Sequence, residues 1–519
     1  MMINKFEDLK KNIFKINYLW FIFVFGAVLY LRQYIANRSL WLDEAMVSLD
    51  VIRLPVVHFL HQPLAYLQVA PFGFLVVEKS LVSLLGTGEP VLRSFPLVCG
   101  VVSLWFFYRM ARIYLNGEFT ILALFAFTVT PALVYYSSQV KPYGTDVFFT
   151  LLSYVVIAEI CFKGLDWDKT IMMAWLGAVI IWFSFPVVFI LLGIGLVLIL
   201  DAWVQRDRAG LLMRGLIFLY WLASFILCYK VLLYNCTQVI ETPDFQPWQS
   251  GYVSLTGNNN GLNILNGILI YPVGIPYFLS WFAGILFCVG GYSFFRADKR
   301  KSLLLLVPLV FVFLASALHK FPCKERLTLF LVPIFLIMIV KGVETFSSKM
   351  GRYKIIAVFV IAGALFGCSF FSILQGLMEP ATLEANRNEE IRSVISYVKE
   401  HRLPGDNLFI SYASAPAFEY YAPGYGFSDG SYIEQQASYS SYTKAQSQDW
   451  KNNLEELKGS KRVWVIVSHI MSNRINGKHP EELLLEYLSR SGGQLIDRSS
   501  SKGACVYLFD LSKFPGEKH

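Results

Sequence analysis

The sequence has few charged residues and no paired-cysteine motif. Of its 519 residues only 16% are charged and 55% are hydrophobic. Such a composition excludes one large soluble domain and predicts a polytopic membrane protein. The eight cysteines form no Cys-x-x-Cys pattern and lie mostly in apolar runs, so we interpret them as small packing residues.

Apolar runs of about 20 residues, the length that crosses a bilayer, recur along the first three quarters of the chain. They predict an α-helical membrane protein with about 11 transmembrane helices. We place these spans at 17–36, 92–113, 119–138, 146–162, 170–185, 187–204, 212–233, 272–295, 302–318, 327–345 and 355–374.

Basic residues collect at alternate ends of these spans, which is the pattern of cytoplasmic loops. By contrast, residues 235–271 contain no Lys or Arg. This asymmetry predicts a cytoplasmic N-terminus and places everything after about Glu379 outside. The first run is long and has no small-residue cleavage site, so we expect no cleaved signal peptide. The basic clusters lie at 5–15, 109–112, 163–169, 206–214, 296–301 and 349–354.

The first outer loop, residues 37–91, has helical segments of its own. Residues 45–60 are apolar with interspersed polar residues, which predicts an interfacial helix. Residues 72–85 are apolar apart from Glu78 and Lys79. That run is short for a span and favours a re-entrant or interfacial helix. We therefore assign residues 1–379 to a membrane module that includes this loop.

Residues 380–519 alternate helical and strand patterns, which predicts a small extracytoplasmic α/β domain. We expect helices at 391–401 and 481–489, and strands at 407–412, 462–467 and 505–509. Residues 420–442 are rich in Tyr, Ser and Gly, and we expect a loop there.

Two adjacent acids, Asp43 and Glu44, directly follow the first span. Acids favour helix N-termini, so the pair could simply cap the next helix. A carboxylate at a membrane surface could equally work in catalysis.

Several cations break the positive-inside pattern on the predicted outer face. They suggest a bound anion such as a phosphate, or pairing with nearby acids or lipid headgroups. These residues are Lys141, Lys320, Lys324 and Arg326.

A lipid phosphate carrying a sugar fits this arrangement chemically. Its phosphate is a good leaving group that needs positive charge. One carboxylate then suffices to deprotonate an acceptor hydroxyl.

Six short motifs resemble those of the GT-C glycosyltransferases. They are most similar to family 39-like bacterial members, which are related to protein O-mannosyltransferases and aminoarabinose transferases. The motifs are Leu-Trp-Leu-Asp-Glu-Ala at 40–45, Gln-Val-Ala-Pro-Phe-Gly-Phe at 68–74, Glu-Lys at 78–79, Leu-Arg at 92–93, Val-Lys-Pro-Tyr at 140–143 with Asp146, and Arg-Leu-Thr-Leu-Phe-Leu-Val-Pro at 326–333.

The resemblance implies an inverting transfer from a polyprenyl-phosphate sugar to an acceptor hydroxyl, at the outer face of a bacterial cytoplasmic membrane. It makes Asp43 the catalytic base, with Glu44 and Asp146 in supporting catalytic roles. Many relatives have an acid where this sequence has Gln139, which leaves open what holds Lys141 and what binds the sugar. The implied donor-phosphate residues are Lys141, Arg326, Tyr143 and Lys324, and the implied substrate-binding residues are Gln68, Arg93 and Gln139.

Two other classes stay open: a transporter or flippase of a lipid-linked or anionic solute, and a non-catalytic scaffold with an outer binding domain. We predict no cofactor, and a divalent metal held by His58, His61, His319 and Cys323 is not favoured. The predicted partners are a polyprenyl-phosphate-linked sugar, membrane lipids and an acceptor that is a glycan, a lipid or a protein. No nucleic acid is expected.

Overall fold

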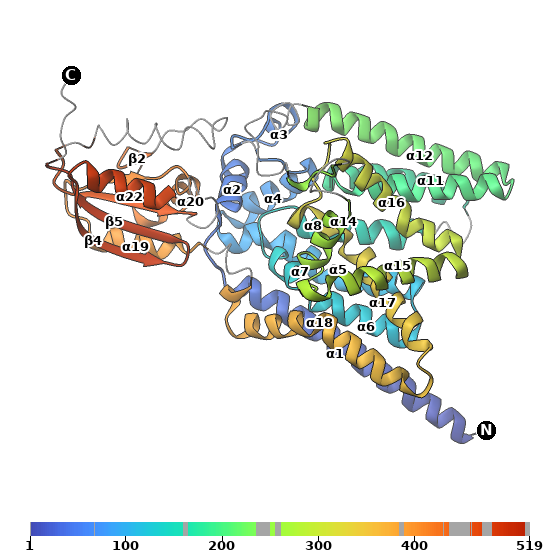
Figure 1. Ribbon diagram of the computed structural model, residues 1–519. Helices are drawn as coiled ribbons and strands as arrows, with labels where there is room; N and C mark the ends of the chain where they lie inside the picture. The colour runs from blue at the N-terminus through green and yellow to red at the C-terminus, as the bar shows by residue number, and fades with distance from the viewer. Residues whose placement is uncertain are drawn as a thin grey trace. The chain divides into compact units, whose positions relative to one another are not determined.

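The chain forms two compact units in the computed structural model (Figure 1). The first comprises Met1–Ala36, Ala70–Tyr234 and Pro247–Leu383, and the second Asn37–Val69, Asn235–Gln246 and Glu384–His519. Residues 37–69 are thus grouped with the C-terminal part of the chain. The predicted domain boundary between residues 379 and 380 stays a prediction. The structure describes residues 2–66, 68–158, 165–234, 250–254, 261–383, 389–428, 430–434, 457, 459–469 and 480–513.

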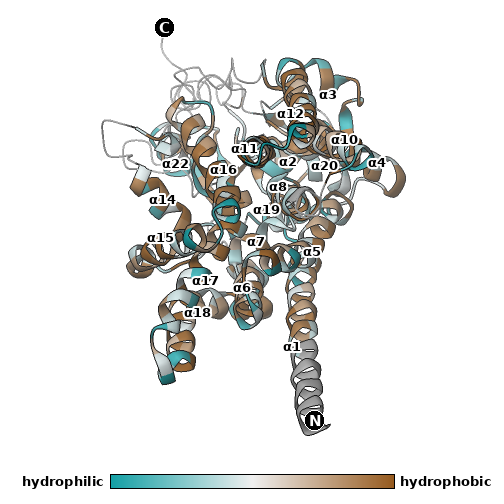
Figure 2. Cartoon of the chain, turned by 90° about the vertical axis from the view of Figure 1, so that its right-hand side faces the viewer, coloured by the Kyte–Doolittle hydropathy of each residue, from teal (hydrophilic) through white to brown (hydrophobic). Residues whose placement is uncertain are grey.

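The first unit is helical. Within the described residues, eight of its helices are long and apolar enough to cross a membrane, so the chain is a multi-pass membrane protein. Apolar residues, brown in Figure 2, dominate these helices. Its elements are α1 (Met2–Ile35), α4 (Phe72–Leu85), α5 (Glu89–Tyr114), α6 (Gly117–Thr128), α7 (Pro131–Tyr136), α8 (Tyr143–Leu152), η1 (Ser153–Ala158), α10 (Trp167–Phe183), α11 (Val187–Val204), α12 (Arg208–Cys228), η2 (Tyr229–Leu233), α14 (Gly261–Ile270), η4 (Tyr277–Leu279), α15 (Ser280–Ala297), α16 (Lys299–Ala317), η5 (Glu325–Leu331), α17 (Val332–Ser348), η6 (Gly351–Tyr353), α18 (Lys354–Met378) and η7 (Pro380–Thr382).

Three of the predicted spans are not among the eight long helices. The run predicted at 119–138 divides into α6 and α7, because Pro131 cannot continue a helix and holds Thr130 in an extended conformation. The run at 146–162 is α8 followed by a π-helical turn, and its last residues lie outside the described part of the chain. The run at 170–185 is the 17-residue α10.

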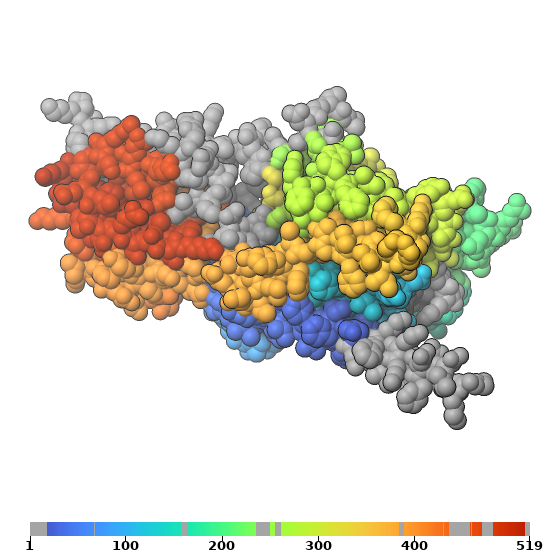
Figure 3. Space-filling model, turned by 60° about the horizontal axis from the view of Figure 1, so that its bottom comes forward, coloured from blue at the N-terminus to red at the C-terminus, as the bar shows by residue number. Residues whose placement is uncertain are grey.

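Helix α17 forms the centre of the first unit. Most of its residues are buried, and it packs against α15, α6 and α18. The first and last long helices of the unit also contact each other, because Arg32 of α1 donates a hydrogen bond to the Leu377 carbonyl of α18 at 3.1 Å. Figure 3 shows the blue α1 beside the orange α18. Tight packing around this helix joins the described helices of the unit in a continuous hydrophobic core.

The second unit contains helices α2 (Leu42–Arg53) and α3 (His58–His61), together with the α/β domain. That domain has a five-stranded sheet in the order β2-β1-β3-β5-β4, in which β1 pairs in parallel with β2 and β3 while β5 pairs antiparallel with β3 and β4. Its elements are α19 (Ile391–His401), β1 (Asn407–Ile410), α20 (Ala415–Tyr425), β2 (Ile433–Glu434), β3 (Val463–Ser468), α22 (Pro480–Arg490), β4 (Gln494–Ser501) and β5 (Ala504–Asp510).

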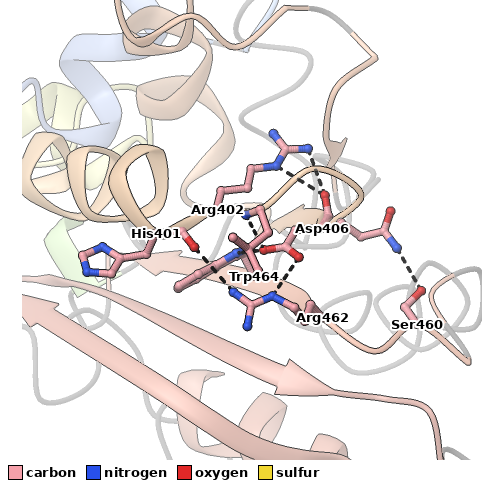
Figure 4. A network of polar contacts seen from close by, with 8 residues as sticks. His401, Arg402, Asp406, Ser460, Arg462 and Trp464 are labelled. Carbon is pink, nitrogen blue, oxygen red and sulfur yellow. Dashed lines mark hydrogen bonds and ion pairs between the residues drawn. The ribbon is translucent and has the colours of Figure 1, made fainter.

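The buried carboxylate of Asp406 ties together the turn that leads into β1 (Figure 4). It accepts hydrogen bonds from Arg462 Nε at 2.8 Å, from Trp464 Nε1 at 2.9 Å and from the Leu403 N–H at 3.0 Å. Because these donors satisfy the carboxylate, it can lie inside the domain without exposing its charge to apolar surroundings.

Three parts of the α/β domain differ from the sequence-based expectation. The loop expected at 420–442 is wrong from Tyr420 to Tyr425, where α20 ends, and again at strand β2, which pairs with β1. The composition misled because Pro423 and Gly424 read as breakers, yet they fall in the last turn before Gly426, which caps the helix with a positive φ of 84°. Strand β4 was not expected, because it is a polar edge strand that is exposed for most of its length.

Candidate functional site

The acidic motif begins helix α2 in the second unit. Glu44 is at the third helical position, is buried, and accepts the Trp41 N–H at 3.3 Å. Arg38 lies 4.0 Å from the same carboxylate. Asp43 is one position earlier and only half-buried. The two acids therefore differ: Glu44 is engaged in capping the helix, whereas Asp43 keeps access to solvent.

Gln68 lies beside the same helix, where its Nε2 donates to Met46 Sδ at 3.2 Å. Asp50 is the third acid on α2. Its Oδ1 accepts the Ala65 N–H at 3.4 Å, and burial raises the pKa of this carboxyl to about 6. Its Oδ2 has no hydrogen-bond partner among the described residues. Asp50 thus adds a third carboxylate to the helix that carries Asp43 and Glu44.

The predicted phosphate-binding residues lie in the first unit, around the turn between α7 and α8. Lys141 is in this turn with only 4% of its surface exposed, and Gln139 is equally buried. Tyr143 begins α8 directly after Pro142. A buried ammonium group is costly, so this turn must hold an anionic or strongly polar neighbour near Lys141.

Arg326 reaches this turn from η5, 183 residues further along the chain than Tyr143. Its Nε donates to the Tyr143 hydroxyl at 3.1 Å, and its guanidinium lies 5.6 Å from the centre of the Tyr143 ring. Tyr143 in turn packs edge-on against Tyr136, whose hydroxyl lies 3.0 Å from that of Tyr271. Lys141 and Arg326, two of the cations that break the positive-inside pattern, therefore lie at one turn lined by aromatic side chains.

The remaining predicted residues of the first unit divide into two groups. Arg93 on α5 and Asp146 on α8 are buried, and Asp146 Oδ1 has no hydrogen-bond partner among the described residues. Lys324 instead donates to Ser250 Oγ at 2.9 Å on the surface, a contact that requires no bound phosphate. Its predicted role, like those of the other site residues, stays a prediction.

Glu78 is a functional candidate to which the sequence analysis gave no role. It is fully buried in α4, and neither carboxylate oxygen has a hydrogen-bond partner within the described chain. The sequence did contain a signal of its burial: Glu78 is four residues from both Phe74 and Val82, and residues four apart share one helix face. In the structure both of these neighbours are buried. An isolated buried carboxyl group is typical of a functional site.

The structure thus assembles two partial sites. Asp43, Glu44, Asp50 and Gln68 lie together around α2 in the second unit. Lys141, Tyr143 and Arg326 lie together in the first. Among the described residues no group of three or more His, Cys, Asp or Glu side chains is placed to hold a metal.

The sequence matches no protein-family model and no curated protein sequence. Solved structures do match. ArnT from Cupriavidus metallidurans in the apo state is similar with a TM-score of 0.55 at 13% identity, covering 96% of this chain and 99% of that one. The same protein bound to undecaprenyl phosphate gives 0.53 at 14% identity, covering 93% and 97%.

The archaeal oligosaccharyltransferase AglB from Archaeoglobus fulgidus, in complex with an inhibitory peptide and a dolichol-phosphate, is similar as well. Its TM-score is 0.52 at 12% identity, covering 95% of this chain and 74% of that one. At these identities the likeness establishes the fold alone, which this chain shares with ArnT and AglB, both GT-C glycosyltransferases. In this chain the fold comprises a polytopic helical module and an α/β domain in the C-terminal part. The predicted fold class is confirmed.

Proposed function

We propose that this GT-C-fold chain is an integral-membrane inverting glycosyltransferase. It moves a hexosyl or pentosyl group from a polyprenyl-phosphate sugar to an acceptor hydroxyl. The acceptor is a glycan, a lipid or a protein at the outer face of a bacterial cytoplasmic membrane. The N-terminus is cytoplasmic in this proposal, and the α/β domain is extracytoplasmic.

The proposal rests on one observation: Arg326 contacts Tyr143, which directly follows the turn that contains Lys141. Lys141 is buried and Arg326 half-buried, and both lie at ends of apolar helices. A guanidinium and an ammonium group at such a place suit a phosphate whose lipid tail stays in the bilayer. That two proteins of the same fold have polyprenyl phosphates in their structures supports this reading.

The chemistry needs one base and a stabilised leaving group. Asp43 takes the proton of the acceptor hydroxyl as its oxygen bonds to the anomeric carbon of the donor. The bond between that carbon and the phosphate oxygen breaks on the opposite face, and its electron pair stays on the phosphate. Lys141 and Arg326 stabilise that developing charge, so no proton donor is required.

The test replaces Asp43 by Asn in purified protein reconstituted with undecaprenyl-phosphate sugars and membranes of the source cell. We expect release of undecaprenyl phosphate to fall about 10²- to 10⁴-fold, because general-base catalysis contributes that much. The matched control is Asp168→Asn, an exposed carboxylate at the start of α10. Turnover at the wild-type rate by the Asp43 variant would remove the base assignment.

The phosphate site is tested separately with undecaprenyl phosphate itself. Arg326→Gln should weaken its binding about 10- to 100-fold, since a charge-assisted hydrogen bond contributes about 1.5–3 kcal/mol. Arg206→Gln, at an exposed turn, is the control. Unchanged affinity would contradict the site, and movement of the lipid across vesicles without sugar transfer would favour a flippase.

A further inference from the structure

The segment that leads into the acidic motif has no helical or strand structure of its own. Residues 37–41 lie between α1 and α2, and Asn37 has a positive φ of 40°. Asp43 follows directly in the first turn of α2. Backbone hydrogen bonds of a helix or sheet do not hold this segment, so the direction of that first turn depends on what the segment contacts.

The start of α19 in the α/β domain binds this segment first. Glu390 accepts the Ser39 N–H at 3.3 Å and the Ser39 hydroxyl at 2.9 Å. Arg392 donates through Nε to Ser39 Oγ at 3.0 Å and through Nη2 to the Asn37 carbonyl. One acidic and one basic residue thus bind the segment at two positions, Asn37 and Ser39.

Helix α20 holds the next residue. The Leu40 N–H donates to the Tyr421 hydroxyl at 2.8 Å, and Leu40 and Tyr421 are both buried. The guanidinium of Arg392 lies 5.8 Å from the centre of the Tyr421 ring. The side chain that binds Ser39 and the side chain that binds Leu40 therefore also contact each other. Since Leu40 is only three residues from Asp43, this hydrogen bond fixes the backbone just before the helix.

The contacts continue along the loop on either side of Asp43. The Trp41 ring lies 5.5 Å from that of His469, whose Nδ1 is 2.5 Å from Glu389. At the far end of α2, Arg53 pairs with Glu419 of α20 at 2.7 Å. The α/β domain therefore holds both ends of the helix that carries the acid.

We propose that the α/β domain positions Asp43, with Tyr421 as the chief positioning residue. This inference rests on the proposed function, because it assigns Asp43 a catalytic task that needs a fixed direction. Segments 351 and 381 residues apart meet at Ser39 and Leu40. A misplacement of about 1 Å at a reacting group can lower turnover about 10²-fold, so such a support has a measurable consequence.

The test uses Tyr421→Phe in the full-length protein, which removes only the hydroxyl that accepts the Leu40 N–H. The control is Tyr425→Phe on the same helix, where no hydrogen bond to the hydroxyl is found among the described residues. We expect kcat to fall about 10- to 100-fold in Tyr421→Phe, with the KM for the undecaprenyl-phosphate sugar and the affinity for undecaprenyl phosphate unchanged.

Amide hydrogen exchange gives a readout that is independent of activity. Peptides covering residues 38–46 should exchange faster in Tyr421→Phe and at the wild-type rate in Tyr425→Phe. If Tyr421→Phe folds poorly, the variant Glu390→Gln, at the half-buried start of α19, is used in its place. It should likewise lower kcat and speed the exchange of residues 38–46.

Three results would overturn the inference: unchanged kcat, unchanged exchange of residues 38–46, or a loss confined to the donor KM. A failure of the proposed function is recognised separately, because the wild-type protein then releases no undecaprenyl phosphate. A failure of the base assignment leaves Asp43→Asn with full turnover. In both cases the exchange experiment still decides whether the α/β domain holds the loop.

Discussion

At the scale of single residues, Asp406 shows how a buried charge becomes a source of stability. Burial alone would raise its pKa, but the Leu403 N–H, Arg462 and Trp464 outweigh burial and hold the pKa below its ordinary 3.8. The folded state therefore binds this proton less readily than the unfolded chain does. Its contribution to stability is present above about pH 4 and is lost as the pH falls through the lowered pKa.

Removing that carboxylate should destabilise the α/β domain. We expect Asp406→Ala to lower the free energy of unfolding by about 3 kcal/mol, because the buried Trp464 N–H and the Arg462 guanidinium lose their partner. Denaturant unfolding followed by tryptophan fluorescence would measure the change. Glu400→Ala, an exposed position on α19, should stay within about 0.5 kcal/mol of wild type, and an equal loss there would contradict the mechanism.

At the scale of elements, two glycines set how closely α15 and α17 approach. A Cβ at Gly342 would lie 2.0 Å from the Leu286 carbonyl oxygen, and one at Gly290 the same distance from the Met338 carbonyl oxygen. Each helix thus packs its glycine against the backbone of the other, as small residues allow in membrane helices. No change of side-chain rotamer can relieve such a contact.

Gly342→Ala should therefore weaken the core of the first unit. We expect a loss of about 1–3 kcal/mol or more, because the two helices must separate to admit the methyl group. Thermal stability of the purified protein in detergent would report it. The matched control is Gly367→Ala in α18, where a Cβ meets no atom within 4 Å and alanine improves helix propensity. Equal stability of the two variants would contradict the close approach.

At the scale of the whole molecule, the joined segments of the second unit make its stability depend on pH. Glu434 of β2 lies beside Glu419 of α20, which also pairs with Arg53 of α2 and accepts the Tyr66 hydroxyl at 3.1 Å. Burial, and next the charge of Glu419, raise the pKa of Glu434 to about 7 from its ordinary 4.5.

The sign of the pH effect follows from proton binding. Between about pH 4.5 and 7 the folded chain keeps a proton on Glu434 that the unfolded chain releases, so stability falls as the pH rises through this window. We expect Glu434→Gln to remove that part of the fall and to raise the melting temperature at pH 7.5. Melting curves from pH 5 to 8 would test it, with Glu400→Gln as the control. A Glu434→Gln profile that parallels wild type would contradict the assignment.

Much of the architecture followed from the sequence alone, because it depends on local pattern. Run length and apolar content predicted α4 at its observed bounds and eight long helices near theirs. Strand β3 was expected within one residue, since a continuous run of β-branched and aromatic residues has no competing local preference. The end of α20 was missed because Pro423 and Gly424 are usually helix breakers, and β4 was missed because it is a polar, mostly exposed edge strand. Strand β2 has only two residues and no pattern of its own.

For the candidate site, the positions of charged residues in the sequence indicated Asp43, Lys141 and Arg326. A cation or a carboxylate beside an apolar span is costly unless it has a binding partner or a function. The contacts of these residues were decided only in three dimensions. Arg326 reaches Tyr143 across 183 residues, and the Tyr421 hydroxyl meets the Leu40 N–H across 381. Local spacing carries no information about which distant surfaces will pack. The sequence therefore determined which residues could act, and the tertiary structure decided what holds them.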